Sequence, residues 1–198
     1  MRRYGVTAVT VMTIVVSAMV VLEGPVAADP TVDEIAPPLP VIVPTPSSWQ
    51  PKFPFPYDQT KGSVTPADIN AEREMCQWYT AQYETLLTQI DRFDNTLAAD
   101  NGDYNAGGNQ MLADAVTANV QQSVDFLAPR AQSLTQSQDF AGDGYFPLYE
   151  GKSFYLMWQL LSNVAAGIRG RQPAWFYGPS VQRVMRWGTR IQRSHVCD

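Results

Sequence analysis

Apolar residues between positions 66 and 99 are spaced alternately three and four apart, and this spacing constrains the fold more than any other feature. It holds for seven residues: Cys76, Tyr79, Tyr83, Leu86, Ile90, Phe93 and Leu97. Just before them, Thr65, Pro66 and Asp68 supply an N-cap, a proline suited to the first helical position and an acid for the first turn. Because steps of three and four keep side chains on one face of a helix, we predict one long helix over residues 66–99.

Three further helices are predicted downstream. The second has an apolar face of Leu112, Val116, Val120, Val124 and Leu127, and Pro129 is expected to kink or end it. The third, over residues 153–168, is apolar on nearly every face, which is typical of a buried central helix. The last is predicted from Ser180 to Cys197, with one seam made of Val181, Val184, Gly188, Ile191 and His195.

The predicted fold class is all-α, an antiparallel up-down four-helix bundle domain over residues 65–198. Loops 100–109 and 170–179, which contain Gly, Asn and Pro, separate the helices, and loops of this length favour antiparallel neighbours. In this topology the start of the first helix lies beside the end of the last. Those are the positions of Cys76 and Cys197.

The first 28 residues have the parts of a secretory signal peptide. Two arginines follow Met1, residues 4–22 are uncharged, and small residues stand at Val26 and Ala28. We therefore expect cleavage after Ala28, and a protein that is secreted or held in the cell envelope. The alternative is an uncleaved membrane anchor, since a span of about 20 residues crosses a bilayer.

Cys76 and Cys197 are the two cysteines of the chain, and both follow the predicted signal peptide. In an oxidising compartment two such cysteines generally pair. The chain-entropy model assigns a loop of this length about 4–5 kcal/mol of stabilisation. We predict a Cys76–Cys197 disulfide.

Residues 29–64 form a proline-rich segment, because ten of the fifteen prolines fall between positions 29 and 66. Proline removes a backbone donor and fixes φ, so this part is expected to be extended. It could be a solvated tether or a strap on the helices. Its interleaved large residues favour the strap: Ile42, Val43, Trp49, Phe53, Phe55 and Tyr57. We expect the second half to pack on the helices and Thr31–Pro46 to be a free spacer, although Ala36–Pro40 could also serve as a peptide ligand.

Charge is divided along the chain. The whole carries 19 acidic and 14 basic residues, and between positions 151 and 197 there is no Asp or Glu. The net charge of −5 argues against a nucleic-acid-binding protein. Arginines at three- and four-residue steps form one face of the last helix: Arg183, Arg186, Arg190 and Arg193. This face is either neutralised by acids of the first long helix (Glu72, Glu84 and Asp91) or available as a docking face for an anionic envelope component or a protein complex.

Residues 139–150, "DFAGDGYFPLYE", have the outline of a calcium loop. Asp139, Asp143 and Glu150 stand at ligand positions, but Ala141 replaces a ligand and Pro147 occupies the ninth place. Calcium is therefore a weak candidate. A turn anchored by its aromatic residues is the stronger interpretation.

A second candidate is the end of the bundle where loops 100–109 and 170–179 meet. It would bring Asp100, Asp103, Tyr104 and Asn105 near Arg171, Trp175, Phe176 and Tyr177. Aromatic rings beside carboxylates are typical of glycan-binding surfaces, and paired carboxylates also occur in glycosidases. The alternative is that these aromatic residues cap the core.

His195 is the single histidine, and no nucleophile motif accompanies it. One histidine and a paired cysteine couple cannot make a zinc site. We expect no catalytic residues, no metal and no cofactor.

The layout resembles the small exported helical proteins of mycobacterial-type actinobacteria: a signal ending "VAADP", a proline-rich lead and a helical domain with one disulfide. The resemblance implies export and assigns no functional residue. We therefore expect a non-catalytic envelope or secreted protein that acts as a binding or accessory module. The alternative is a ligand carrier or glycan-binding protein that uses the aromatic end, and contact with a membrane is expected only through an uncleaved N-terminus.

Overall fold

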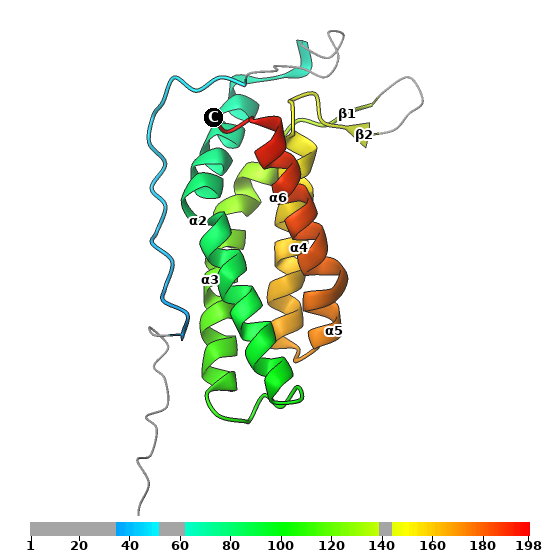
Figure 1. Ribbon diagram of the computed structural model, residues 1–198. Helices are drawn as coiled ribbons and strands as arrows, with labels where there is room; N and C mark the ends of the chain where they lie inside the picture. The colour runs from blue at the N-terminus through cyan, green and yellow to red at the C-terminus, as the bar shows by residue number, and fades with distance from the viewer. Residues whose placement is uncertain (1–34, 52–61, 139–143) are drawn as a thin grey trace, which may run out of the picture.

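The computed structural model describes residues 35–51, 62–138 and 144–198. The predicted signal peptide and the aromatic residues Phe53, Phe55 and Tyr57 of the proline-rich segment lie outside these ranges. The described part is all-α (Figure 1), and its main helices are α2 (Pro66–Ala99), α3 (Asn109–Ser133), α4 (Gly151–Arg169) and α6 (Gln182–Ser194).

Smaller elements join the helices. A short helix α5 (Pro173–Trp175) and a π-helical turn η2 (Phe176–Val181) connect α4 to α6, so the predicted loop 170–179 is partly helical. Between α3 and α4, the two-residue strands β1 (Ser137–Gln138) and β2 (Gly144–Tyr145) pair antiparallel, with Ser137 opposite Tyr145.

The main helices pack in sequence: α2 against α3, α3 against α4, and α4 against α6. Figure 1 shows them side by side, with α6 and α2 meeting where the C-terminus ends. Fully buried side chains such as Phe93, Leu127, Phe154 and Leu161 fill the space between them. In the described ranges, none of the helices is both long and apolar enough to span a membrane.

Helix α2 has the predicted bounds, and its N-terminus explains why it begins there. The side chain of Thr65 accepts from the Asp68 amide at 3.2 Å, and the Thr65 amide donates to the Asp68 carboxylate at 2.8 Å. Together they form a capping box that satisfies two exposed backbone donors. Asp68 also accepts from the Thr135 amide at 2.6 Å, which fixes the end of α3 to the start of α2.

Of the two outcomes expected at Pro129, a kink or an end of the helix, the structure excludes the end, since α3 continues to Ser133. Arg130 also donates to the Phe126 carbonyl at 2.6 Å. The last helix does not reach Cys197, because His195 takes a left-handed conformation with φ 57° that ends α6 at Ser194.

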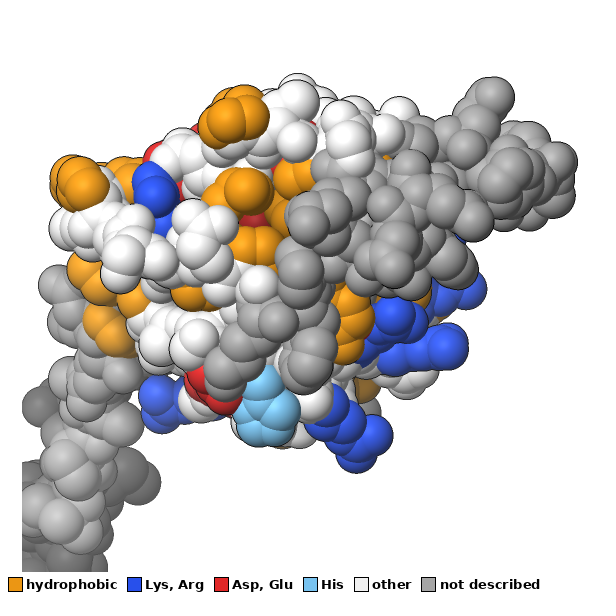
Figure 2. Space-filling view, turned by 90° about the horizontal axis from the view of Figure 1, so that it is seen from above, with side chains coloured by type: hydrophobic (Ala, Val, Ile, Leu, Met, Phe, Trp, Pro, Cys, Tyr) orange, Lys and Arg blue, Asp and Glu red, His pale blue; other side chains and the backbone are white. Residues whose placement is uncertain are grey.

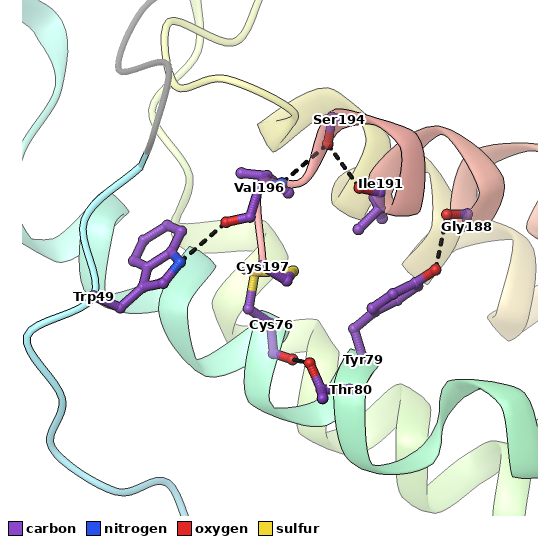
Figure 3. Close-up of a disulfide and its surroundings, with 9 residues drawn as sticks. All are labelled: Trp49, Cys76, Tyr79, Thr80, Gly188, Ile191, Ser194, Val196 and Cys197. Carbon is purple, nitrogen blue, oxygen red and sulfur yellow. Dashed lines mark hydrogen bonds between the residues drawn. A yellow bond between two sulfur atoms is a disulfide. The ribbon is translucent and has the colours of Figure 1, made fainter.

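The predicted disulfide is confirmed. The sulfur atoms of Cys76 and Cys197 are bonded, and the two Cα atoms lie 5.1 Å apart. Figure 3 shows this bond between α2 and the turn that follows α6, with Trp49 on one side donating to the Val196 carbonyl at 3.0 Å. The disulfide therefore joins the first and last long elements where the strap also arrives.

Residues 35–51, which we call the strap, do not act as the predicted free spacer. Figure 1 shows this segment extended along α2. Ala36 and Leu39 are 1% and 5% exposed and belong to the core. The prediction failed because it followed the large aromatic residues, whereas Ala36 and Leu39, which stand beside prolines, are also buried.

Candidate functional site

Four arginines stand on the outer side of α6. Arg183, Arg186, Arg190 and Arg193 are exposed, whereas the alternate positions Val184, Gly188 and Ile191 are buried. Figure 2 shows several Lys and Arg side chains close together at the lower right of the view, and others apart from them at the left. We call these four residues the arginine face.

A hollow of about 590 Å³ lies between the start of α4 and the last turns of α6. It is lined by Tyr149, Glu150, Arg186, Trp187, Thr189, Arg190, Arg193 and Ser194. A second hollow of about 440 Å³ shares Arg186 and Trp187 and extends toward α4, where Leu156 and Leu160 line it. The two hollows make one continuous basic and aromatic surface.

Glu150 is the acidic group in the larger hollow. Its side chain is 3% exposed and lies 2.9 Å from the Nε of Arg190, whose side chain is 60% exposed. The hydroxyl of Ser153 also donates to Glu150. Glu150 stands at the N-cap position of α4 with φ 62°, a conformation that non-glycine residues seldom adopt. Backbone strain of this kind is concentrated at functional sites.

The other three arginines of the face differ from Arg190 in their partners. Among the residues that the structure describes, no ion pair involves Arg183, Arg186 or Arg193. The guanidinium groups of Arg186 and Arg190 lie 6.0 and 5.8 Å from the ring centre of Trp187. Guanidinium groups can bind carboxylate, phosphate or sulfate through paired hydrogen bonds. The arrangement therefore suits an anionic ligand.

The acids of α2 that might have neutralised this face make no ion pair with it in the described ranges. Glu84 is exposed, whereas Glu72 is 0% exposed. Neither carboxylate oxygen of Glu72 has a hydrogen-bond partner among the described residues. Burial raises the pKa of Glu72 well above its ordinary value, and the charges of Glu150 and Asp68 add to the shift.

The calcium candidate is only partly described, because Asp139 and Asp143 lie outside the described residues. Its third member, Glu150, is engaged with Arg190 and Ser153. No group of three or more His, Cys, Asp or Glu residues suited to a metal ion occurs within the described ranges.

The second half of the calcium candidate is a turn anchored by apolar side chains. Leu148 is 3% exposed, and the ring of Phe146 lies 5.1 Å from that of Tyr155. This geometry favours the interpretation of residues 144–150 as a packed turn.

At the aromatic end of the bundle, Tyr104 packs against neighbouring side chains of the protein itself. Tyr104 is 6% exposed, its ring lies 5.9 Å from that of Phe93, and the Arg171 guanidinium stands 5.6 Å from it. Burial raises the pKa of Tyr104, partly offset by Arg171. The structure thus brings Arg171 to Tyr104 as predicted, but places the tyrosine ring in the core.

The carboxylates of Asp100 and Asp103 accept hydrogen bonds from residues of the same loop and of the start of α3. Asn109 donates to the Asp100 carboxylate at 2.7 Å and to the Asp103 carbonyl at 2.8 Å. The Asn105 amide donates to the Asp103 carboxylate at 2.8 Å. Tyr177 is 38% exposed, and the side chains of Trp175 and Phe176 lie outside what the structure describes.

His195 is not part of either candidate site. Its side chain is 64% exposed, and its Nδ1 atom lies 2.6 Å from the carboxylate of Asp198.

Sequence reasoning missed two features. One is the ion pair between Glu150 and Arg190. Glu150 has a left-handed backbone conformation, and the sequence contains no pattern that predicts it. The other is a set of buried amides on α2 and α3 that contact the strap: Gln82, Gln89 and Asn119. Their spacing offered a signal, because Gln82 and Gln89 stand seven residues apart on one helix face.

Comparison of the chain with protein-family models, with curated proteins and with solved structures finds no match.

Proposed function

We propose that this protein is an exported, non-catalytic binding module that docks through its arginine face onto an anionic component of the cell envelope. In this proposal the helices form an antiparallel up-down bundle that serves as a rigid support. The observation that carries it is the hollow of about 590 Å³, where Arg186, Arg190 and Arg193 meet a single described carboxylate, Glu150. Because the four arginines stand on one helix, their spacing is fixed, and a fixed spacing favours the binding of a specific anionic ligand.

The electrostatics support this proposal. The chain is acidic overall, with a net charge of −5, yet it concentrates exposed arginines on α6. A local positive surface on an acidic protein attracts anions while the remaining surface repels them, and this sets the orientation of docking. Trp187 adds an aromatic surface between the two hollows. The face is favoured over the aromatic end, where Tyr104 is buried.

Export is supported by two features. The disulfide Cys76–Cys197 is of the kind that persists in oxidising compartments. Residues 1–28 have the sequence of a signal peptide, followed by the proline-rich segment. Secretion and retention in the envelope are both compatible with these features, and a docking face for an anionic envelope component favours retention.

The test is a cross-linked pull-down of the tagged, full-length protein from its native envelope. The test variant is Arg186→Gln with Arg193→Gln, and the control is Arg92→Gln with Arg169→Gln, which removes two exposed arginines from elsewhere. We expect the wild type and the control to recover the same partner, and the test variant to recover at least tenfold less. Equal recovery by both variants would contradict docking through this face.

Salt dependence provides a second readout. Contacts between exposed charges are screened over about 8–10 Å at physiological ionic strength. Recovery by the wild type should therefore fall steeply as salt is raised. A recovery that is independent of salt would assign the docking to apolar contacts.

A further inference from the structure

The groove between α2 and α3 is lined by side-chain amides that contact the backbone of the strap. Gln89 and Asn119 each donate to the Pro37 carbonyl at 2.9 Å. Gln122 donates to the Leu39 carbonyl at 3.1 Å. In return, the Leu39 amide donates to the Asn119 side-chain oxygen at 3.1 Å. Three amides from two helices thus hold two residues of extended chain, Pro37 and Leu39.

Two of these side-chain amides also hydrogen-bond to each other, independently of the strap. The Asn119 side chain donates to the Gln89 oxygen at 2.8 Å, so each amide orients the other. Gln82 and Gln122 extend the row, and both donate to the Pro40 carbonyl. Gln82, Gln89 and Asn119 are between 2% and 4% exposed. Buried polar groups of this kind specify one geometry when their hydrogen bonds are satisfied.

A second contact follows nearer the end of the strap. Gln77 donates to the Thr45 carbonyl at 2.8 Å and accepts from the Thr45 amide at 3.0 Å. Arg73 donates to the Ser47 carbonyl at 3.2 Å. Contacts to the strap are therefore spread along α2 from Arg73 to Gln89, and the strap runs antiparallel to this helix.

This pattern matches the chemistry of a proline-rich chain. An extended proline-rich helix makes no internal hydrogen bonds, so its carbonyl oxygens are free to accept from a partner. It also has three residues per turn, which places residues three apart on one side. Ala36 and Leu39 have this spacing and are the two strap residues in the core, while Pro37, Pro38 and Pro40 are exposed.

We propose that the α2–α3 groove is a recognition site for proline-rich segments, with residues 36–40 as its intramolecular ligand. Its external ligand would be a proline-rich segment of another polypeptide with a small residue and a leucine three positions apart. This inference concerns a different face from the arginine face and does not depend on the function proposed above.

Exchange of the strap for such a peptide is physically reasonable. The groove amides are neutral, so no charge is left buried when the strap leaves, and water replaces the lost hydrogen bonds. The strap lies outside the loop closed by Cys76 and Cys197, so the disulfide does not hold it. A peptide that makes the same backbone contacts would therefore compete directly with the strap.

The test uses the full-length protein and a fluorescent peptide with the sequence of residues 35–46, followed by fluorescence anisotropy. Leu39→Asp in the protein should release the strap and open the groove. We expect this variant to bind the peptide at least tenfold more tightly than the wild type, whose own strap competes. Val41→Asp is the matched control, because Val41 is 79% exposed, and it should behave as the wild type.

Specificity is checked with two further changes. A peptide with aspartate in place of leucine at the position of Leu39 should not bind. Adding Asn119→Ala to the Leu39→Asp protein should reduce binding at least tenfold. A folded Leu39→Asp protein that does not bind the peptide, or that binds both peptides equally, would overturn the proposal.

Hydrogen exchange in the wild type covers the case in which Leu39→Asp does not fold. If the strap opens by itself, the Leu39 amide should exchange at least tenfold faster than the Ile90 amide in the middle of α2. Exchange of both amides at the same rate would show that the strap leaves only when the whole domain unfolds. The groove would then be part of the core, and the proposal would fail.

Discussion

The hydroxyl of Tyr83 occupies the place where a Cβ atom would stand on Gly188. A Cβ built there would overlap both the hydroxyl and the ring of Tyr83. The neighbouring Tyr79 stacks on Tyr83 with ring centres 4.6 Å apart and donates to the Gly188 carbonyl at 2.9 Å. The distance between α2 and α6 is therefore set by two tyrosines against one glycine.

Gly188→Ala should destabilise the protein by about 1–3 kcal/mol, which is typical of overpacking. Alanine is the better helix former by about 1 kcal/mol, but the overlap with the Tyr83 ring outweighs this gain. Urea unfolding monitored by circular dichroism measures the effect. Gly62→Ala is the control, since no atom lies within 4 Å of the added methyl and the residue precedes α2, and it should change stability by less than about 0.5 kcal/mol. Equal effects would contradict this account.

Replacing both Cys76 and Cys197 by serine should lower the free energy of unfolding by about 5 kcal/mol. The two residues are 121 positions apart, and the chain-entropy model gives this value for so long a loop. Chemical denaturation of the variant and of the oxidised wild type provides the comparison. The wild type treated with a reductant should match the variant. A loss below about 1 kcal/mol would mean that the unfolded chain is already restricted without the bond.

Glu72→Gln should raise stability at pH 7. The unfolded chain ionises Glu72 near 4.5, whereas burial keeps the proton on the folded protein to higher pH. Across this window the unfolded state binds fewer protons, so the free energy of unfolding falls as pH rises, by about 1.4 kcal/mol per pH unit. Glutamine titrates no proton and should remove this slope.

Unfolding of wild type and variant between pH 4 and pH 8 measures the effect of Glu72. We expect a gain of about 1 kcal/mol or more at pH 7, and convergence of the two curves at acid pH. Glu84→Gln, an exposed site on the same helix, serves as the control. Parallel curves for wild type and Glu72→Gln would show that Glu72 is ionised in both states.

Leu39→Ala should cost about 2–3 kcal/mol, in the range for a buried leucine. Val41→Ala should change stability by less than about 0.5 kcal/mol, because Val41 is 79% exposed whereas Leu39 is 5% exposed. Thermal and urea unfolding of the two variants make the comparison. Similar losses at both positions would mean that the strap is not anchored at Leu39.

The helices could be predicted because their signals are local. For α2, both the capping residues Thr65 and Asp68 and the apolar steps from Cys76 are properties of neighbouring positions. The pairing of Cys76 with Cys197 was predicted from the presence of two cysteines and from the expected oxidising compartment. These features depend little on long-range detail.

The strap and the site depended on contacts between distant residues. Leu39 packs in the core, and its amide donates to the side-chain oxygen of Asn119, 80 positions away. The spacing of Gln82 and Gln89 places both on one face of α2, but it does not show that a proline carbonyl lies opposite Gln89. The pairing of Glu150 with Arg190 required a left-handed residue at the start of α4. These contacts depend on how distant segments pack together, and this packing cannot be predicted from a single sequence.

The disulfide divides the polypeptide into a covalent ring and an open arm. The ring runs from Cys76 to Cys197 and contains most of α2 and all of α3, α4 and α6. A protease that cuts once inside the ring leaves two pieces joined by sulfur, so the chain keeps its mass on a non-reducing gel. A cut between the strap and Cys76 releases the arm. The start of α2 before Cys76 also lies outside the ring, so a cut between the strap and α2 detaches the strap and leaves all of α2 with the ring.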